Sequence, residues 1–425
     1  MVGWHDADAD VVRATGIRYA RAGRYHAPVA EPLADEPIDA TSWAPACPQA
    51  PMPALERLVP NGLDELGFDE DCQRLSITAP PDATPGEALP VMVWIHGGSY
   101  VFGGGDSPVY DPAPIVREQR VVVVAVTYRL GMLGYLRGHD GEAANLGLLD
   151  QIEALRWVQR NIAAFGGDPD TVTVFGESAG GDAAAHLMIA DGAKGLLRRV
   201  IVQSSPFGLT RERAEMAAIM RRTAATLIED DAPVEEVVAA QAKVELAVRR
   251  FGLRGAMAFG LQYGADPLPA EDDLDEAWRA AAPDVDVLVG STEREVALFT
   301  ERFAVLRTRL LSRVVERRLV APLTESIYGR GARDFAERHR DAGGRAAHYT
   351  MTWAVPGSPL AGAHASDLPL VFGGPAWDGA PVVDGSSWAD VVDLGLQVRA
   401  IWAEMARTGT VAPVEIPGLI TVTPA

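Results

Sequence analysis

Residues 175–181, FGESAGG, follow a short apolar stretch and precede an alanine-rich one. Within them GESAG fits the pattern G-x-S-x-G, in which a serine stands on a sharp turn between a strand and a helix. A structural serine in a glycine-rich turn would match the same letters. The flanks favour the strand-to-helix turn, because residues 171–175 are β-branched and apolar and residues from Ala179 onward suit a helix. The sequence therefore predicts Ser178 as a nucleophile.

Other short apolar stretches stand in the order that a layered α/β fold requires. VMVWIHG from Val91, VVVVAVTY from Val121 and TVTVFGES from Thr171 are typical of strands buried on both faces of a parallel sheet. Residues 145–167 between the last two repeat apolar side chains at helical spacing and end in two glycines. A helical segment and the strand-like RRVIVQSS follow the turn. This alternation predicts an α/β fold with a doubly wound, mostly parallel central sheet flanked by helices.

The second half of the chain adds helices to this sheet. Residues 208–282 and 300–345 contain charged helical stretches, separated by the strand-like VDVLVGS from Val285. No Pro/Ser-rich linker and no internal repeat divides the chain. We therefore predict a single domain over residues 1–425 with helical cap insertions in these two ranges. Insertions of this kind often form a substrate pocket.

Composition limits the classes of partner. Hydrophobic residues make up 48% of the chain, and 58 acidic residues against 38 basic ones give a formal charge of −20 at pH 7. This charge repels phosphate backbones and anionic lipid surfaces. The longest aliphatic run, residues 121–126, is far shorter than the roughly 18 residues of a membrane span, and MVGWHDADAD shows no secretory signal. We expect a cytoplasmic protein without a nucleic-acid partner or a membrane span.

A serine nucleophile needs a histidine base and an acid that orients the base. In chains with this turn, the acid and the histidine follow the serine in that order. His339 lies in the charged helical run DFAERHRD and His348 in a strand-like stretch, where structural roles are expected. His364 lies in the loop VPGSPLAGAHASDLP, which could turn toward the top of the sheet. We predict His364 as the base.

The acid and the oxyanion donors are expected at the ends of two other strands. After the strand from Val285, STEREV offers Glu293 and Glu295, and periodicity does not choose between them. The glycine loop of WIHGGSYVFGGG, residues 94–105, follows a strand and offers backbone N–H groups for an oxyanion. A phosphate-binding loop is the alternative for this segment, but neither G-x-x-x-x-G-K-[ST] nor G-x-G-x-x-G is present.

Several of these stretches together resemble the type-B carboxylesterases, the family with the α/β-hydrolase fold that includes the cholinesterases. The most specific are GESAGG with the helical stretch before it, WIHGGSYVFGGG, YRLGMLGYL, the EDC of residues 70–72, HASDLPLVFGG and GSTEREVALF. The resemblance extends from about Gly16 to beyond Trp402. It implies a carboxylic-ester hydrolase with a triad of Ser178, Glu295 and His364.

The resemblance also implies residues that support this triad. It favours Glu295 over Glu293 as the acid. The supporting residues that it implies are the oxyanion-hole residues Gly97, Gly98, Ser99 and Ala179 and the neighbouring side chains Glu177 and Ser204. Ser204 is expected to hydrogen-bond the acid. Cys47 and Cys72 match the first disulfide pair of the family.

Two departures from the family pattern carry expectations. Ser99 stands where the family usually has a third glycine, which adds a side chain beside the acyl site and narrows or polarises the pocket. The separation of Glu295 and His364 is shorter than the resemblance implies. Part of the helical cap is therefore expected to be missing, with a more open site and a looser choice of substrate as the result.

Other activities share this triad. An amidase, a thioesterase or an acyltransferase uses the same groups, and pocket shape selects among them. The family also contains non-catalytic adhesion proteins, which lack a complete triad. Every triad position is filled here, so we expect a serine esterase that acts on small or medium carboxylic esters through a covalent acyl-enzyme. This chemistry requires no metal and no organic cofactor.

Overall fold

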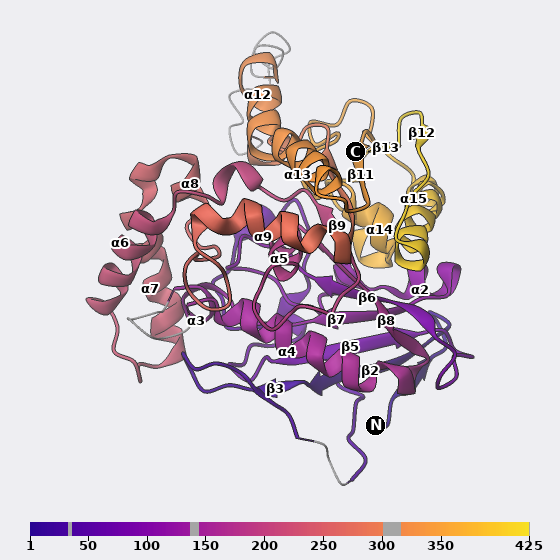
Figure 1. Ribbon diagram of the computed structural model, residues 1–425, viewed down its shortest axis with the longest axis horizontal. Coiled ribbons are helices and arrows are strands. Elements are labelled where there is room, and N and C mark those ends of the chain that lie inside the picture. The colour runs from indigo at the N-terminus through magenta and orange to yellow at the C-terminus, as the bar shows by residue number, and fades with distance from the viewer. Residues whose placement is uncertain (33–35, 137–143, 301–315, 425) are drawn as a thin grey trace.

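One large mixed sheet runs through the molecule (Figure 1). The computed structural model describes residues 1–32, 36–136, 144–300 and 316–424. Within them the sheet has the strand order β1-β2-β5-β7-β6-β8-β9-β10-β11-β13-β12. Its strands are β1 (Trp4–Asp6), β2 (Val11–Arg18), β5 (Arg74–Ala79), β6 (Leu89–Ile95), β7 (Val122–Val126), β8 (Gly167–Glu177), β9 (Arg199–Gln203), β10 (Asp286–Thr292), β11 (Ala346–Met351), β12 (Val414–Ile416) and β13 (Ile420–Pro424). A separate pair is formed by β3 (Ala20–Arg21) and β4 (Val29–Ala30).

The centre of this sheet is parallel and its edges are antiparallel. Strands β7, β6, β8, β9, β10 and β11 pair in parallel in that order. Strands β1, β2 and β5 on one side and β12 and β13 on the other are antiparallel. The predicted fold class is confirmed, and the three apolar stretches named above correspond to β6, β7 and β8. The loops that follow β6, β8 and β10 therefore lie at one edge of the sheet, where sites of such folds form.

Helices cover both faces of the sheet (Figure 1). They are α1 (Pro53–Glu56), α2 (Ala113–Gln119), α3 (Gly131–Gly134), α4 (Leu146–Asn161), α5 (Ala179–Leu187), α6 (Ala214–Ala225), α7 (Val234–Ala247), α8 (Leu253–Ala256), α9 (Leu274–Ala281), α10 (Ala297–Thr300), α12 (Ala321–Thr324), α13 (Arg330–Asp341), α14 (Leu368–Phe372) and α15 (Trp388–Thr408). Strand β8 runs directly into α5 through the predicted turn.

Side chains of the central strands alternate between two hydrophobic cores, one on each face. In β6, Val91, Val93 and Ile95 belong to the core that α4 and α5 cover. Met92 and Trp94 belong to the opposite core, which α2, α14 and α15 cover. Because both faces are covered, these strands are apolar throughout rather than alternating.

The structure describes one of the two predicted cap insertions in full and the other only in part. Residues 208–282 form α6 to α9 together with short connecting turns, and α6, α7 and α8 lie together at one side of the sheet (Figure 1). In the second range, α12 and α13 are present. The helical stretch expected over residues 301–319 lies outside the described residues except for residues 316–319. The single domain with these caps stays a prediction.

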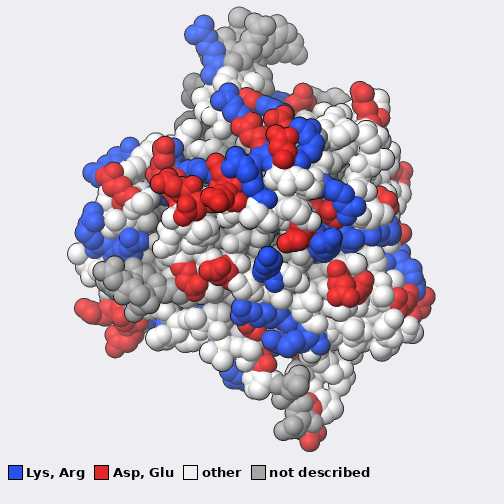
Figure 2. Space-filling model, in the orientation of Figure 1, with Lys and Arg blue, Asp and Glu red and all other residues white. Residues whose placement is uncertain are grey.

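The surface carries both signs of charge. Figure 2 shows acidic and basic side chains interspersed over one face of the molecule. Acidic residues crowd the start of α9, where Glu271, Asp272, Asp273, Asp275 and Glu276 follow one another closely. In the described ranges, no helix is both long and apolar enough to span a bilayer. The cytoplasmic location and the lack of a nucleic-acid partner stay predictions.

The two cysteines are free thiols, so the implied disulfide is not formed. Cys47 and Cys72 are both buried. The Cys47 sulfur accepts a hydrogen bond from the backbone N–H of Leu130 at 3.3 Å. A hydrogen bond with the Cys47 side chain, together with burial, raises the pKa of Cys72 well above its usual value. A thiol with a raised pKa holds little thiolate, which is the form that reacts toward a disulfide.

A buried ion pair fixes the loop that follows β7. Arg129 donates from Nε and Nη2 to the carboxylate of Asp150 in α4, at 2.8 and 2.7 Å. The backbone N–H of Arg129 donates to the same carboxylate at 3.1 Å. Two residues later, the N–H of Gly131 donates to the carbonyl of Tyr100 at 2.7 Å. Because the ion pair fixes Arg129, it also holds Gly131 in place to donate to Tyr100 in the loop after β6.

Replacing Asp150 by asparagine should lower the free energy of unfolding by about 3–5 kcal/mol, because a buried guanidinium would lose its counter-charge. Urea unfolding followed by circular dichroism measures this change. The control is Asp393→Asn on α15, whose side chain is exposed, and we expect a change within about 0.5 kcal/mol there. Similar values for the two variants would show that the buried pair has no special role.

Candidate active site

Ser178 lies on the turn between β8 and α5 in a strained backbone conformation. Its φ and ψ are 57° and −121°, a combination that L-residues rarely adopt and that concentrates at functional sites. Its N–H donates to the carbonyl of Gln203 at 2.9 Å, and its carbonyl accepts from the N–H of Asp182 at 2.9 Å. The turn is therefore fixed by β9 on one side and by α5 on the other.

Two glycines allow this turn to close against the end of β6. A methyl group on Gly180 would lie 2.0 Å from the carbonyl oxygen of Ile95. One on Gly176 would lie 2.5 Å from the backbone of Gly180 and 2.7 Å from the same oxygen. Because no side chain fits at either position, the glycines of G-x-S-x-G are required by the packing of the backbone.

The structure brings His364 and Glu295 together beside this turn. His364 Nδ1 lies 2.5 Å from Glu295 Oε2. Glu295 Oε1 accepts a hydrogen bond from the backbone N–H of Thr292 at 2.7 Å, so both carboxylate oxygens are held. Glu295 is fully buried, whereas Glu293 is exposed. Of the two glutamates that periodicity left open, Glu295 is the one that contacts His364.

The other two candidate histidines lie elsewhere. His339 Nε2 is 2.8 Å from the carbonyl of Val285, at the opposite end of β10 from Glu295. His348 stands within β11, opposite Val289 of β10. Both positions agree with the structural roles expected for these residues.

Glu177 occupies the other side of the His364 imidazole. Its Oε1 lies 3.1 Å from Nε2, and both side chains are buried. Ser178 Oγ, by comparison, has no hydrogen-bond partner in the part of the chain that the structure describes. Hydrogen bonds between a nucleophile and its base are often formed only when substrate binds. The Nε2 atom that faces Glu177 is the one that a serine hydroxyl would have to reach.

The charges of this cluster shift the pKa values of its members. Burial raises the pKa of Glu177 to about 8; His364 opposes this shift, while Asp367 and Glu295 add to it. For His364, burial lowers the pKa, but the negative charges of Glu177 and Glu295 outweigh burial and raise it above its ordinary value. Protons are therefore held more tightly in this cluster than on isolated side chains.

The loop after β6 packs directly on the turn that carries Ser178. A methyl group on Gly97 would lie 3.2 Å from Ser178 Cβ. The backbone N–H groups of Gly98, Ser99 and Ala179 donate to no residue within the described ranges. Unused backbone donors next to a nucleophile are the groups that an oxyanion hole requires.

Two residues of this loop adopt a conformation that favours glycine. Ser99 and Tyr100 have φ values of 55° and 62°, and the left-handed region costs a non-glycine residue roughly 1–2 kcal/mol. The Tyr100 hydroxyl donates to Asp182 Oδ2 at 2.6 Å. The backbone carbonyl of Tyr100 accepts from the N–H of Gly131. These anchors hold the loop in place although serine replaces the usual glycine.

His96 fixes the first peptide of the loop after β6, and sequence reasoning did not identify this contact. Its ring stacks on that of Tyr128 with centroids 4.4 Å apart, and Nδ1 lies 2.8 Å from the carbonyl oxygen of Gly97. Burial lowers the pKa of His96 to about 4, so the neutral ring donates to this carbonyl. Because the C=O and N–H of a trans peptide point in opposite directions, this bond turns the N–H of Gly98 away from His96. The only signal in the sequence was its place directly before the two glycines.

Ser204 does not hold the acid, so this expectation was wrong. Its Oγ is buried and has no hydrogen-bond partner among the described residues. Glu295 already receives one donor on each carboxylate oxygen, from Thr292 and His364. The N–H of Ser204 donates instead to the carbonyl of Gly290 at 2.8 Å.

The sequence profile of the Carboxylesterase family matches residues 5–310. This chain belongs to the carboxylesterase family. It is 35% identical over 424 residues to the probable N-octanoylanthranilate hydrolase AqdA2 of Rhodococcus erythropolis, covering 95% of this chain and 90% of that one. It is 32% identical over 432 residues to the para-nitrobenzyl esterase of Bacillus subtilis, covering 93% and 86%. A solved thermophilic para-nitrobenzyl esterase superimposes with a TM-score of 0.82 at 29% identity, covering 99% of this chain and 95% of that one.

These comparisons confirm the predicted α/β-hydrolase fold and the enzyme class. The carboxylesterase is a serine hydrolase that acts on carboxylic esters. The roles of its individual residues are not tested by the comparisons and are taken up below as proposals.

In this carboxylesterase, His96→Phe should lower kcat by about 10- to 100-fold with little change in KM. The ring would still stack on Tyr128, but the bond that orients the Gly97–Gly98 peptide would be lost, and a misplaced oxyanion donor acts mainly on the transition state. Steady-state kinetics with a nitrophenyl ester measures kcat and KM separately. His339→Phe removes a similar bond far from the site and should leave kcat unchanged; an equal loss in both variants would point to a general effect on folding.

Glu177→Gln should move the acidic limb of the kcat/KM profile to lower pH. The base must be neutral to accept a proton, so activity rises as the pH passes the pKa of His364. Removing one of the carboxylates that raise this pKa lowers it. Profiles from about pH 6 to about pH 11 are needed, because the raised pKa of His364 lies at about 9. Glu293→Gln is the control, and a limb that stays in place or moves upward in Glu177→Gln would contradict the assignment.

Proposed function

We propose that this protein hydrolyses small or medium carboxylic esters through a covalent acyl-enzyme, with Ser178 as nucleophile, His364 as base and Glu295 as the acid that orients the base. The contact of His364 Nδ1 with Glu295 Oε2 at 2.5 Å, beside the strained turn that carries Ser178, is the observation that supports this most directly. The contact between His364 and Glu295 would not support this function by itself, because buried histidine–carboxylate pairs also occur as structural features. Its position beside the strained turn gives it weight.

In the first half of the reaction, Ser178 Oγ attacks the ester carbonyl carbon while His364 Nε2 takes the hydroxyl proton. Glu295 keeps the other imidazole proton on Nδ1, which leaves Nε2 free as the acceptor, and stabilises the imidazolium that forms. The imidazolium then gives its proton to the departing alcohol oxygen as the carbon–oxygen bond breaks. Water attacks the acyl-enzyme in the second half, with the same proton transfers, and releases the acid.

The developing oxyanion is stabilised by backbone donors. We assign this role to the N–H groups of Gly98, Ser99 and Ala179, which have no other acceptor among the described residues. They come from two segments that pack against each other, so their spacing is set before substrate binds. A preorganised donor of this kind is typically worth about 3–4 kcal/mol of the activation barrier.

Aromatic rings beside the imidazole favour uncharged substrates. The ring centroids of Phe299 and Tyr328 lie 5.6 and 5.3 Å from that of His364. Tyr328 belongs to an apolar cluster that includes Val296 and Leu298. Apolar walls with a few polar groups are typical of small-molecule sites. The name of the Bacillus relative, para-nitrobenzyl esterase, is in keeping with such a substrate.

Hydrolysis of an N-acyl bond is a second candidate activity. The relative from Rhodococcus is named for an N-octanoyl substrate and covers 95% of this chain. The same triad would serve, with His364 giving its proton to a departing amine. Octanoate esters and N-octanoyl anilides that carry the same leaving aromatic ring separate the two: we expect the larger kcat/KM for the ester, and a larger value for the anilide would make N-acyl hydrolysis the principal activity.

The triad is tested by covalent labelling and by a matched pair of glutamate variants. A fluorophosphonate should add one adduct to the wild type, found by intact mass and mapped to Ser178, and none to Ser178→Ala. Glu295→Gln should lower kcat by about 10³- to 10⁴-fold, because the imidazole loses its orienting carboxylate. Glu293→Gln, only two residues away, should keep wild-type activity.

Folded wild-type protein that takes no adduct would contradict the assignment of Ser178. Equal activity of the two glutamate variants would contradict that of Glu295. Thermal melting of each variant separates these results from a loss of the folded state.

A further inference from the structure

The turn that follows Gly98 has a conformation that its own residues disfavour. The N–H groups of Val101 and Phe102 both donate to the carbonyl of Gly98 at 3.0 Å, which closes a tight turn around Ser99 and Tyr100. Both central residues have positive φ, at 55° and 62°, as in a type I′ turn. Asparagine, aspartate and glycine are the residues that favour this turn, and none of them stands at either position. Contacts outside the turn are therefore needed to hold it in this form.

The side chain of Tyr100 supplies one such contact. Its hydroxyl donates to Oδ2 of Asp182 at 2.6 Å, and both side chains are buried. Burial, together with the charge of Asp182, raises the pKa of Tyr100 well above its usual value, so the hydroxyl keeps the proton that it donates. A buried hydrogen bond to a carboxylate is stronger than one between neutral groups. This bond therefore opposes the preference of the turn for negative φ.

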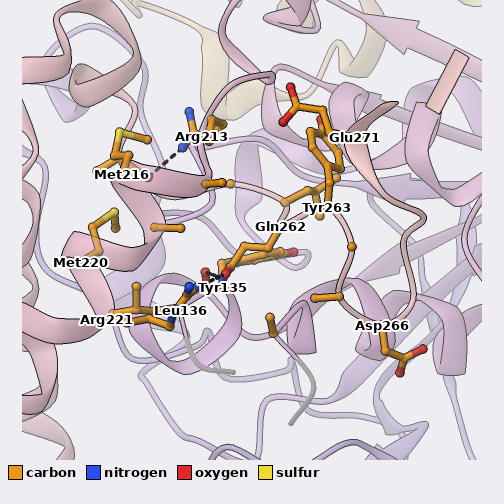
Figure 3. A pocket seen from close by; sticks show the side chains of 18 of the residues that line it. Tyr135, Leu136, Arg213, Met216, Met220, Arg221, Gln262, Tyr263, Asp266 and Glu271 are labelled. Atoms are coloured by element: carbon orange, nitrogen blue, oxygen red, sulfur yellow. Dashed lines mark hydrogen bonds between the residues drawn. The ribbon is translucent and has the colours of Figure 1, made fainter. Parts of the chain in front are cut away.

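The carboxylate of Asp182 has no other hydrogen-bond donor among the described residues. Oδ1 has no hydrogen-bond partner there, and Oδ2 accepts only from Tyr100. His186, one turn along α5, has Nδ1 2.7 Å from the backbone carbonyl oxygen of Asp182 and 3.3 Å from Oδ1, so it bonds the backbone. His186 Nε2 lies 3.2 Å from the hydroxyl of Tyr263, which lines a cavity of about 890 Å³ (Figure 3).

Arg213, which also lines this cavity (Figure 3), does not bond the carboxylate. The charge of Asp182 acts on Arg213, because it opposes the lowering of the Arg213 pKa that burial causes. The N–H groups of the guanidinium donate instead to the backbone carbonyls of Leu209, Met257 and Ala258, at 3.1, 2.8 and 2.7 Å. The hydrogen bond from Tyr100 is therefore the contact through which Asp182 acts on the turn.

This hydrogen bond joins the two segments that carry the proposed oxyanion donors. The N–H of Ser99 directly precedes Tyr100 in the turn, and the N–H of Ala179 lies in the same first turn of α5 as Asp182. A change of φ at Ser99 or Tyr100 would rotate the peptide groups on either side of it, because φ is one of the two soft dihedrals of a residue. The N–H of Ser99 would then lose its present direction.

We propose that Asp182 is a positioning residue for the oxyanion hole, and that it acts through the Tyr100 hydroxyl to hold the turn of Ser99 and Tyr100 at positive φ. The inference rests on the proposed function, because it concerns the oxyanion of that reaction. It also states why the bond is needed in this chain: residue 99 is serine rather than glycine, so the turn does not keep positive φ by itself.

Tyr100→Phe removes the bond and leaves the ring against that of Tyr135, whose centroid lies 4.6 Å away. We expect kcat for a nitrophenyl ester, per site that a fluorophosphonate labels, to fall about 10- to 100-fold with little change in KM, because a misplaced oxyanion donor acts mainly on the transition state. A trifluoromethyl ketone, which adds to a serine hydroxyl and leaves an oxyanion, should bind more weakly by a similar factor. Tyr19→Phe is the control, because it removes a buried bond to the carbonyl of Thr127, and it should leave both quantities unchanged.

Two further variants separate a positioning role from a structural one. Glycine adopts positive φ readily, so in the Ser99→Gly background Tyr100→Phe should lower kcat less than about threefold. Asp182→Asn keeps an acceptor for the hydroxyl but not its charge, and it should lower kcat by a smaller factor than Tyr100→Phe. Thermal melting checks that each variant is folded.

Unchanged kcat in Tyr100→Phe, an equal loss in Tyr19→Phe, or the same loss with and without Ser99→Gly would overturn the proposal. If Tyr100→Phe does not fold, Asp182→Asn measured with and without Ser99→Gly decides the question. Ser178→Ala keeps the proposal distinct from the proposed function. An inactive Ser178→Ala beside a fully active Tyr100→Phe would overturn the role of Asp182 alone, whereas activity that persists in Ser178→Ala would overturn both.

Discussion

The contact of backbone with backbone between the end of β6 and the start of α5 is the constraint on which the site depends. Gly180 approaches the carbonyl of Ile95 so closely that even a methyl group would overlap it. Two features follow from this one contact. The turn of Ser178 is forced into its strained conformation, and the loop that leaves β6 begins beside the nucleophile. The proposed nucleophile and the proposed oxyanion donors are therefore placed by the same packing, without any side chain between them.

A buried polar network then holds the two segments together. The carboxylate of Asp182, one turn after Ser178, accepts from the Tyr100 hydroxyl of the loop after β6, and the backbone carbonyl of Asp182 lies 2.7 Å from His186 Nδ1. His186 Nε2 in turn is 3.2 Å from the hydroxyl of Tyr263, in the loop that lines the cavity of Figure 3. Helix α5 is thus connected to the loop after β6 on one side and to the loop that contains Tyr263 on the other.

The electrostatics of the site come from several buried carboxyl groups near one imidazole. Burial raises the pKa of Asp367 to about 6, as it raises that of Glu177, and Gln203 donates to Asp367 at 2.8 Å. Of the three, only Glu295 has its Oε1 held by a backbone N–H and its Oε2 held by the histidine. The surroundings of Glu295 therefore differ from those of the other two carboxyl groups, Glu177 and Asp367.

The sequence by itself determined the features that depend on neighbouring residues. The turn at Ser178 needs glycines on both sides, and strands buried on two faces need continuous apolar residues, so both left a local pattern. The order of serine and histidine along the chain, with the loop setting of His364, led to the prediction of that histidine, which the structure places beside Glu295. The antiparallel edges of the sheet left no comparable signal, because strand direction depends on connections that periodicity does not record.

Only the tertiary structure decided which side chains meet. Glu293 and Glu295 are equivalent by pattern, but the turn after β10 buries one against His364 and exposes the other. The sequence likewise did not predict the free thiols of Cys47 and Cys72 or the bond from His96 to its neighbouring peptide. Nor did it predict that the Ser204 hydroxyl has no hydrogen-bond partner among the described residues. The physical reason is common to them: a hydrogen bond or a pKa shift depends on distances of a few tenths of an ångström between groups far apart in the chain, and a linear pattern specifies burial and backbone shape but not those distances.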